Sequence, residues 1–305
     1  MAEITTSMVK ELRERTQAGM GDCKSALVEA GGDIDKAVEV ILKKGIVKAA
    51  SRAGKVATEG EVRAVVNGKT GVLVEVNCQT DFVSRGDDFR AFVTKVCDAA
   101  KTAKKGTDLN TLEHAGKTID AWRNEFIAKC GENVVVRRWD ALETTAPNGI
   151  VHSYIHMGGK LGVLIVAEGP SPEATKSKDF TDFVENCAMQ IAAMSPIVVR
   201  KEEVSAAQIA KQKEIFEGQL REEGKPEQAW PKIIDGKIAK WFTEVTLVGQ
   251  EAVWDPSVGT IEKAAATLGA KLGGDVKLVT FVRFGLGEGI EKKTDDLAAE
   301  VAKLM

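Results

Sequence analysis

Two β-strands joined by a tight turn are predicted by one stretch in the middle of the chain, Val62-Arg63-Ala64-Val65-Val66-Asn67-Gly68-Lys69-Thr70-Gly71-Val72-Leu73-Val74-Glu75-Val76. The Asn-Gly pair between its valine-rich halves is typical of a two-residue hairpin turn. A second stretch has the same layout and shares a Lys-x-Gly-Val-Leu core, Val151-His152-Ser153-Tyr154-Ile155-His156-Met157-Gly158-Gly159-Lys160-Leu161-Gly162-Val163-Leu164-Ile165-Val166. The chain therefore contains an internal repeat of a β-hairpin.

An amphipathic helix is predicted after each hairpin. Residues 87–100 place four apolar side chains on one face, Phe89, Phe92, Val93 and Val96. Residues 178–194 do the same after the second hairpin, with Phe180, Phe183, Val184 and Cys187. Because apolar residues at helical spacing mark a face that packs on a core, each sheet is expected to pack its helix on one face. The middle of the chain is thus predicted to be a duplicated α+β unit.

Three short helices are predicted before the first hairpin, within residues 4 to about 44. Gly19 and Gly21 favour a turn after the first, Gly31 and Gly32 break the second, and Asp33 is placed to cap the third. Their apolar faces carry Ile4, Met8, Val9, Leu12, Cys23, Ala26, Leu27, Ile34, Ala37, Val38 and Ile41. A bundle this small has little room for a deep pocket, so we expect a binding module.

Residues 45–60, which follow the bundle, are rich in Ala, Gly, Lys and Arg and lack a wide apolar stripe. We predict a linker with some helical character. Its basic residues either meet an acidic partner or are simply solvated, and the sequence leaves both interpretations open. Further along, a helix is predicted around residues 109–130 and a strand over residues 133–139.

The second unit is interrupted by a strongly charged insertion at about residues 200–243. Two helices flank a predicted turn at Glu223-Gly224-Lys225-Pro226. A helical hairpin that projects from a core leaves an apolar stripe poorly covered, so it is expected to serve association. The second core is predicted to resume with a strand at residues 245–248 and to close with residues 277–284. A charged helix over residues 295–304 is expected to end the chain.

The composition argues against several classes of protein. With 305 residues, two or three domains are expected. The 42 Lys and Arg face 45 Asp and Glu, so the net charge of −3 disfavours a nucleic-acid binder held by bulk charge. A hydrophobic fraction of 44% disfavours a disordered chain. No apolar run approaches the ~18–20 residues that a membrane-spanning helix needs, and we expect no membrane association.

The sequence also predicts where the protein is found. Its start, Met1-Ala2-Glu3-Ile4-Thr5-Thr6, lacks a basic region followed by an apolar one, so we expect no signal peptide. The cysteines are odd in number, widely spaced and free of CxxC pairs: Cys23, Cys78, Cys97, Cys130 and Cys187. This pattern is typical of a reduced protein of the cytoplasm.

Few motifs in the sequence carry catalytic chemistry. No phosphate-binding loop is present, and the glycine-rich run at residues 285–289 has no βαβ unit behind it. Cys78 with His156 as its base would make a thiol enzyme, but no third group orients the pair, and a small buried cysteine at a strand end is favoured. His152 and His156 have no nearby cysteine or carboxylate to complete a metal site. We expect no catalytic residue, no cofactor and no metal.

One segment is harder to explain by packing alone: Glu75-Val76-Asn77-Cys78-Gln79-Thr80-Asp81-Phe82-Val83-Ser84-Arg85. In one interpretation Thr80 or Asp81 caps a helical turn and Phe82 packs beneath the sheet. In the other, Phe82 projects as an anchor with the Asp81 carboxylate beside it, and its burial in a partner would supply about 1.5–3 kcal/mol.

Two long, separated motifs resemble the bacterial elongation factor Ts family, the exchange factors of the GTPase elongation factor Tu. One is residues 75–85, and the other is Leu12-Arg13-Glu14-Arg15-Thr16-Gln17-Ala18-Gly19-Met20-Gly21-Asp22-Cys23-Lys24-Ser25-Ala26-Leu27. The order of the parts matches across essentially the whole chain. The resemblance implies an α+β fold with a ubiquitin-associated-like three-helix bundle, two related α+β core subdomains with antiparallel sheets, an inserted helical hairpin and a C-terminal helix.

The resemblance also implies which residues meet the partner. The bundle would dock on the nucleotide domain of the GTPase through residues at or near the contact, which are Arg13, Met20, Cys23 and Lys24, with Arg52 of the linker. The family's wedge, associated with displacing Mg²⁺ from the partner, corresponds to Thr80, Asp81, Phe82 and Val83. His156 corresponds to a histidine that meets the phosphate-loop side of the partner.

This chain departs from the family pattern at three places. Gly21 stands where relatives often have a second methionine, so a contact there loses its side chain. Arg52 replaces a lysine, which keeps the charge but changes its shape. The turn at Met157-Gly158-Gly159 is one residue longer than in some members, which affects the placement of His156.

The implied function is exchange of GDP for GTP on elongation factor Tu without covalent chemistry, with a possible homodimer or 2:2 complex formed through the hairpin. Two alternatives are a binding adaptor that recruits another protein through its bundle, and the thiol enzyme above. The expected divisions are a docking bundle with its linker (1–55), a first core subdomain (56–140), a second core subdomain (141–198 and 244–285), the hairpin (199–243) and a C-terminal helical module (286–305).

Overall fold

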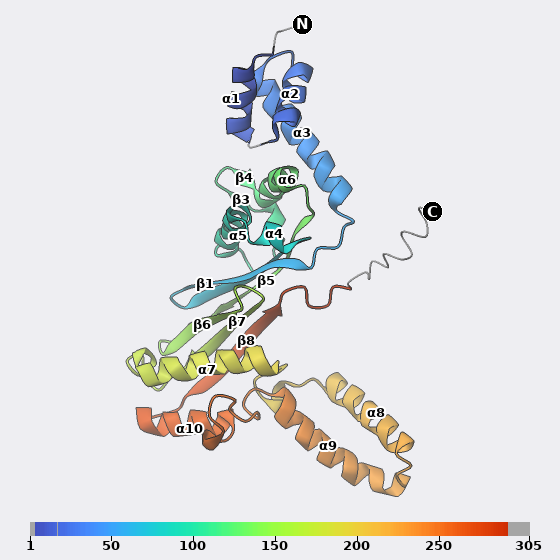
Figure 1. Ribbon diagram of the computed structural model, residues 1–305. Coiled ribbons are helices and arrows are strands. Elements are labelled where there is room, and N and C mark those ends of the chain that lie inside the picture. Colours follow the sequence, from blue (N-terminus) through green and yellow to red (C-terminus); the bar gives the residue numbers. More distant parts are fainter. Residues whose placement is uncertain (1–3, 17, 292–305) are drawn as a thin grey trace.

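The computed structural model describes residues 4–16 and 18–291, and it confirms the predicted α+β class. In chain order the main elements are α1 Thr6–Thr16, α2 Met20–Glu29, α3 Ile34–Arg52, β1 Glu59–Asn67, β2 Thr70–Cys78, α4 Asp81–Ser84, α5 Asp87–Ala100, β3 Glu113–His114, β4 Lys117–Thr118, α6 Ile119–Cys130, β5 Val134–Glu143, β6 Gly149–His156, β7 Leu161–Glu168, α7 Lys178–Met194, α8 Ala206–Glu222, α9 Trp230–Val245, α10 Ile261–Leu272 and β8 Lys277–Gly285. Figure 1 shows them stacked in layers, with α1–α3 at one end and α8–α9 projecting near the other.

The bundle of α1, α2 and α3 packs around its own apolar core, with Asp33 capping α3 by accepting from the backbone N–H of Lys36 at 3.0 Å. The expected end of the third helix near residue 44 is wrong, because α3 continues to Arg52. Its second half packs on α6: a Cβ at Gly45 would lie 3.3 Å from the Cβ of Ala128, and Ala49 is buried in the next core. This packing makes the first half of the expected linker, residues 45–52, helical, in keeping with its expected helical character.

The first sheet has the order β1-β2-β5 and is antiparallel throughout. Helices α5 and α6 cover one of its faces, and Phe89, Phe92 and Val96 of α5 are buried there as predicted. The predicted helix over 109–130 begins only at Ile119, because residues 113–118 form the short β3–β4 hairpin. The expected boundary at residue 140 falls inside β5, which stays paired with β2 as far as Glu143.

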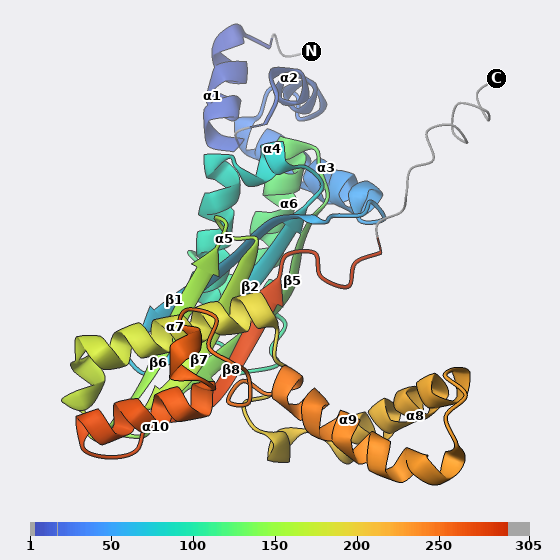
Figure 2. The same cartoon turned by 60° about the horizontal axis from the view of Figure 1, so that its bottom comes forward.

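The second sheet repeats this arrangement with the order β6-β7-β8. Helix α7 packs on it, and α10, which the sequence analysis missed, lies against α7 (Figures 1 and 2). The predicted strand at residues 245–248 is wrong. Helix α9 runs to Val245, and both the backbone N–H and the hydroxyl of Thr246 donate to the carbonyl of Phe242, which leaves a single bridge between Thr246 and Val198.

The faces of the two sheets that carry no helices pack against each other. Their shared core contains Val62, Leu73, Leu142, Val151, Leu164, Val166 and Phe284. Two glycines permit the close approach, because a Cβ at Gly162 would lie 2.6 Å from Val62 Cγ1 and one at Gly71 would lie 2.8 Å from Val151 Cγ1. The sequence predicted the helix-covered face of each sheet but not this contact between the sheets.

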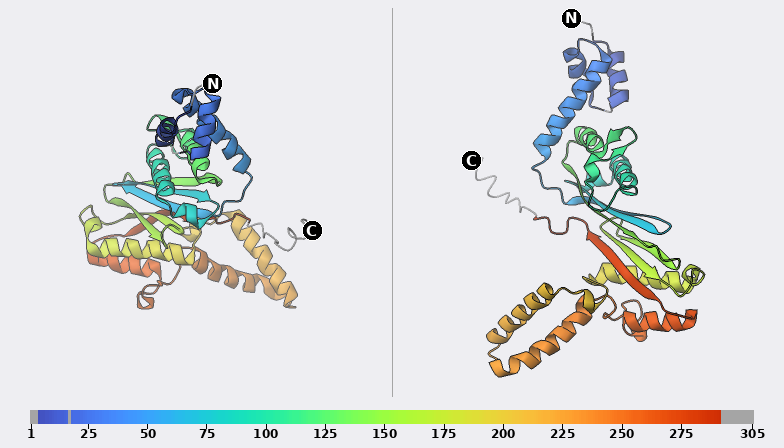
Figure 3. Two further views of the ribbon diagram at one scale, coloured as in Figure 1. Left: turned by 45° about the horizontal axis from the view of Figure 1, so that its top comes forward. Right: turned by 180° about the vertical axis from the view of Figure 1, so that it is seen from behind.

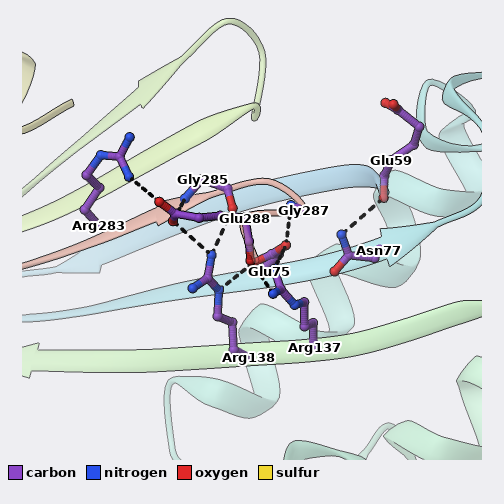
Figure 4. A network of polar contacts seen from close by, with 9 residues as sticks. All are labelled: Glu59, Glu75, Asn77, Arg137, Arg138, Arg283, Gly285, Gly287 and Glu288. Carbon is purple, nitrogen blue, oxygen red and sulfur yellow. Dashed lines mark hydrogen bonds and ion pairs between the residues drawn. The ribbon is translucent and has the colours of Figure 1, made fainter. Parts of the chain in front are cut away.

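Glu75 of β2 is fully buried and joins the two sheets by charge (Figure 4). Its carboxylate accepts from Arg137 Nη1 at 2.8 Å and Arg138 Nε at 2.5 Å, both on β5, and from the backbone N–H of Gly287 at 2.8 Å. Arg138 also donates to the carbonyl of Gly285 at 2.9 Å. The network therefore fastens the first sheet to the end of β8.

The α8–α9 hairpin projects from the second sheet and has a small core of its own, with Leu220, Ile234 and Ile238 buried (Figure 3). Ser205 and Gln208 form a capping box at the start of α8. The last helix of the hairpin ends at Val245, two residues beyond the expected limit of 243. The described start of the C-terminal module, residues 286–291, is not helical, and the predicted helix over 295–304 lies outside the described residues.

Replacing Glu75 by Gln is expected to lower the free energy of unfolding by about 2–3 kcal/mol, because Arg137 and Arg138 lose a charged acceptor. Denaturation in urea measures the change. Asp182→Asn is a matched control: its carboxylate pairs with Lys178 at 2.6 Å on the surface, so its loss should cost less than about 1 kcal/mol. Equal losses in the two variants would contradict the role of the buried network.

Candidate functional site

The short helix α4 presents Phe82 to solvent. The Phe82 side chain is 86% exposed, whereas the next residue, Val83, packs on the core of the first sheet. Thr80 caps the helix, since its hydroxyl oxygen accepts from the backbone N–H of Val83 at 3.4 Å. The capping part of the packing interpretation is therefore right, but its placement of Phe82 beneath the sheet is wrong.

Asp81 lies beside Phe82 and is already paired within the chain. Its carboxylate lies 2.9 Å from Arg85 Nη2, and that arginine side chain is 77% exposed. An exposed ion pair of this kind contributes little stability and exchanges partners easily. Asp81 is thus held next to Phe82 without being locked away from an incoming group.

A surface hollow of about 660 Å³ separates α4 from the turn between β6 and β7. Asp81 and Arg85 line one side, and Ile155, Met157 and the glycines that follow line the other. The turn is fixed on the first sheet, because the backbone N–H of Val62 donates to the carbonyl of Gly159 at 2.8 Å. Met157 is 75% exposed. The hollow is therefore lined by the exposed Met157 on one side and by the Asp81–Arg85 pair on the other.

His156 lies on the other face of strand β6. Its Nδ1 is 2.8 Å from the hydroxyl of Tyr154, and the two rings stack. Both residues line a second, smaller hollow of about 380 Å³ together with Met189 and Trp254. His156 and Phe82 are thus presented on different sides of the β6–β7 turn.

The bundle residues implied by the resemblance do not all reach the surface. Arg13, Met20 and Lys24 are exposed, and Met20 shows 43% of its surface. Cys23 is fully buried, and its thiol donates to the carbonyl of Ala18 at 3.7 Å. The expectation that Cys23 contacts a partner is therefore corrected: its side chain packs the bundle core behind that surface.

Arg52 is exposed at the end of α3, far along the chain from Arg13 in α1 and Lys24 in α2. None of the residues that line the hollow beside Phe82 comes from the bundle. The described structure therefore presents the candidate docking residues and the Phe82 turn as separate surfaces.

Cys78 is unsuited to catalysis. It is fully buried at the end of β2, where desolvation, helped by the nearby Glu132 carboxylate, raises the pKa of its thiol to about 12. The thiol donates to the carbonyl of Thr80 at 3.2 Å, so it stays protonated at neutral pH. These observations argue against the thiol-enzyme alternative.

Within residues 4–16 and 18–291, no group of three or more His, Cys, Asp or Glu side chains is arranged to hold a metal ion. His152 contacts the carboxylate of Glu185, and this pair belongs to no larger group of that kind in the same ranges. In the same ranges, no helix has both the length and the apolar character needed to cross a membrane.

Comparison with known proteins identifies the family. The family model described as elongation factor TS matches residues 79–288, which include the Phe82 turn. The chain belongs to the elongation factor Ts family. It is 43% identical to elongation factor Ts of Nitratiruptor sp. and 44% identical to those of Nautilia profundicola and Symbiobacterium thermophilum, over 99% of its own length and 98–99% of theirs. Membership of the elongation factor Ts family makes this chain a translation elongation factor.

Glu132 supports the site but was not predicted from the sequence. Its carboxylate accepts hydrogen bonds from Gln79 and Thr80, which precede α4. Glu132 lies 52 residues further along the chain than Thr80, and no motif connects the two positions. Only the fold brings them together.

The buried thiols of this chain are expected to resist alkylation. Because the pKa of Cys78 is raised to about 12, the folded chain should show no labelling of that residue by iodoacetamide at pH 8. Cys130, which is only half-buried, should react first. Peptide mass spectrometry measures both, with urea-unfolded protein as the control that labels all five cysteines. Rapid labelling of Cys78 in the folded chain would restore the thiol-enzyme alternative.

Proposed function

We propose that this chain binds elongation factor Tu carrying GDP, in the bacterial cytoplasm, and promotes the exchange of GDP for GTP. The observation that carries the proposal is the 86% exposure of Phe82 on a short helix whose Val83 packs against the first core and whose cap, Thr80, is held by Glu132. A large exposed aromatic side chain on a rigid support is typical of an interface anchor. Membership of the elongation factor Ts family supports the choice of elongation factor Tu as the partner.

Phe82 enters the GTP-binding domain of the partner, and Asp81 enters with it. Once there, the Asp81 carboxylate leaves Arg85 and perturbs the water and carboxylate network around the partner's Mg²⁺. Because Mg²⁺ neutralises phosphate charge, its displacement weakens the hold on GDP. The exposed Asp81–Arg85 pair supports this step, since breaking it costs little.

The free energy for exchange comes from a broad contact. Each tenfold loss of nucleotide affinity requires about 1.4 kcal/mol of preference for the nucleotide-free partner. Phe82 supplies about 1.5–3 kcal/mol on burial, so other contacts supply the rest. Met157 and His156 extend the surface on either side of the β6–β7 turn, and His156 acts toward the phosphate-loop side of the partner.

The bundle provides docking to the same GTPase. Arg13, Met20 and Lys24 offer exposed basic and apolar side chains, and Arg52 adds a charge at the end of α3. Basic side chains around a buried apolar contact favour a complementary acidic surface. By thermodynamic reciprocity, GTP binding then expels the exchange factor, so the cycle runs without covalent chemistry.

Phe82→Ala is expected to slow GDP release from elongation factor Tu roughly tenfold to a hundredfold, the equivalent of about 1.5–3 kcal/mol. Formation of the complex should weaken less, because the other contacts remain. Stopped-flow release of a fluorescent GDP measures the rate. Ile215→Ala on α8 is the control, since it removes a 45% exposed apolar side chain from the hairpin. Unchanged release by Phe82→Ala would refute the wedge, and no stimulation by the wild-type chain would refute exchange itself.

The α8–α9 hairpin serves association, either with a second copy of the chain or with the partner, rather than exchange. Its two ends are close together, because the backbone N–H of Ile197 donates to the carbonyl of Val245 at 2.9 Å. Its own small core keeps it separate from the two sheets.

Replacing residues 206–245 with a short Gly-Ser linker is therefore expected to leave the sheets folded and the rate of GDP release within about twofold of the wild-type rate. Sedimentation velocity of the chain alone and mixed with elongation factor Tu should show a loss of association. A folded deletion variant that no longer stimulates exchange would overturn this assignment.

A further inference from the structure

Glu132 and Asn133, in the three-residue corner between α6 and β5, hold the backbone just before the Phe82 turn. Glu132 Oε2 accepts from the backbone N–H groups of Gln79 at 3.1 Å and Thr80 at 2.9 Å. Glu132 Oε1 accepts from the hydroxyl of Thr80 at 2.5 Å. One carboxylate thus satisfies three donors at the point where β2 ends and α4 begins.

The hydroxyl contact has a directional consequence. Because the Thr80 hydroxyl gives its proton to Glu132, its lone pairs are left to accept from the backbone N–H of Val83 at 3.4 Å. A hydroxyl that donates to a carboxylate is also a better acceptor, since hydrogen bonds in a chain polarise one another. Glu132 therefore sets the orientation of the cap on the helix that carries Phe82.

Asn133 strengthens the corner from the other side. Its backbone N–H donates to the side-chain oxygen of Gln79 at 2.8 Å, and its side-chain amide donates to the carbonyl of Lys55 at 2.7 Å. Asn133 is 5% exposed, and Val134 after it is fully buried. The corner is thus fixed in the core, and the same two residues hold both the start of the Phe82 turn and the segment after α3.

The contacts of Glu132 serve this turn rather than charge balance. Within the described residues it forms no ion pair with a lysine or arginine, and its carboxylate hydrogen bonds all go to residues 79 and 80. A half-buried acidic side chain without a cationic partner is costly unless its oxygens accept hydrogen bonds, as the two oxygens of Glu132 do.

We propose that Glu132 is a positioning residue for nucleotide exchange: it holds the cap of α4 so that Phe82 meets the partner already oriented. This inference rests on the proposed function of Phe82. Preorganisation lowers the entropy lost when the aromatic ring is buried. Loss of Glu132 should therefore reduce the rate of GDP release in the complex more than it weakens the complex.

The first experiment needs no partner. Hydrogen–deuterium exchange of the full chain is compared among wild type, Glu132→Ala and Glu132→Gln. Asp98→Ala is the matched control, because the Asp98 carboxylate pairs on the surface with Lys101, which follows α5. Exchange at Gln79 and Thr80 is expected to rise at least tenfold in Glu132→Ala, less in Glu132→Gln, which keeps one acceptor oxygen, and not in the control. Unchanged exchange at these two amides overturns the proposal.

The second experiment measures GDP release from elongation factor Tu over a range of concentrations of each variant. The maximal rate is expected to fall about tenfold in Glu132→Ala with less than a threefold change in the half-saturating concentration, and Glu132→Gln should recover part of that rate. A normal maximal rate with weakened saturation alone overturns the positioning role. If the wild-type chain fails to stimulate release, the proposed function fails, and the amide exchange still decides whether Glu132 orders the turn.

Discussion

Face-to-face packing of the two sheets determines where every other part of the chain lies. The central strands β2 and β7 are buried along almost their whole length, so each must be covered on both faces. Helices cover one face, and the other sheet covers the second. This contact brings the β6–β7 turn onto β1, where Gly159 accepts from Val62, and so it creates the hollow beside α4. Neither hairpin alone could form that surface.

The Phe82 turn combines exposed outer residues with firmly held inner residues. Of its outer residues, Phe82 is exposed and Asp81 forms one exposed ion pair with Arg85. Its inner residues are held firmly, since Val83 packs on the first core and Thr80 is bound by Glu132. An exposed aromatic ring is unfavourable in the free chain, and that cost is recovered only when the ring is buried elsewhere. The arrangement therefore favours a protein whose aromatic tip acts on another molecule.

Local patterns in the sequence predicted the parts of the fold that depend on neighbouring residues. The first β-hairpin, the Asp33 cap and the buried faces of α5 and α7 follow from short-range rules of turn geometry, capping and periodicity. The two-residue turn of that hairpin is Gly68-Lys69, one residue later than the Asn-Gly pair indicated, because Asn67 pairs with Thr70. The same rules failed where distant contacts decide, as in the extension of α3 over α6.

The candidate site divides in the same way. The motif around Phe82 indicated the candidate site because its residues are contiguous, and the resemblance to a family suggested the proposed partner. Helical periodicity placed Cys23 on the apolar face of its helix, where it is buried, whereas the family motif alone implied a contact with the partner. Glu132 could not be predicted, because its contacts with residues 79 and 80 arise only when α6 returns the chain to the first sheet. Long-range hydrogen bonds of this kind leave no periodic trace in a sequence.

The glycines at the contact between the sheets are reciprocal. Gly162 makes room for Val62, and Gly71 makes room for Val151, while the repeat equates Val62 with Val151 and Gly71 with Gly162. Each hairpin thus places a valine side chain against a glycine of the other hairpin. Two identical subunits form an isologous contact of this kind about a two-fold axis. Within one polypeptide, the two halves of the core therefore meet as the subunits of a homodimer would. A larger side chain in place of the valine of one half would need more space at the glycine of the other half.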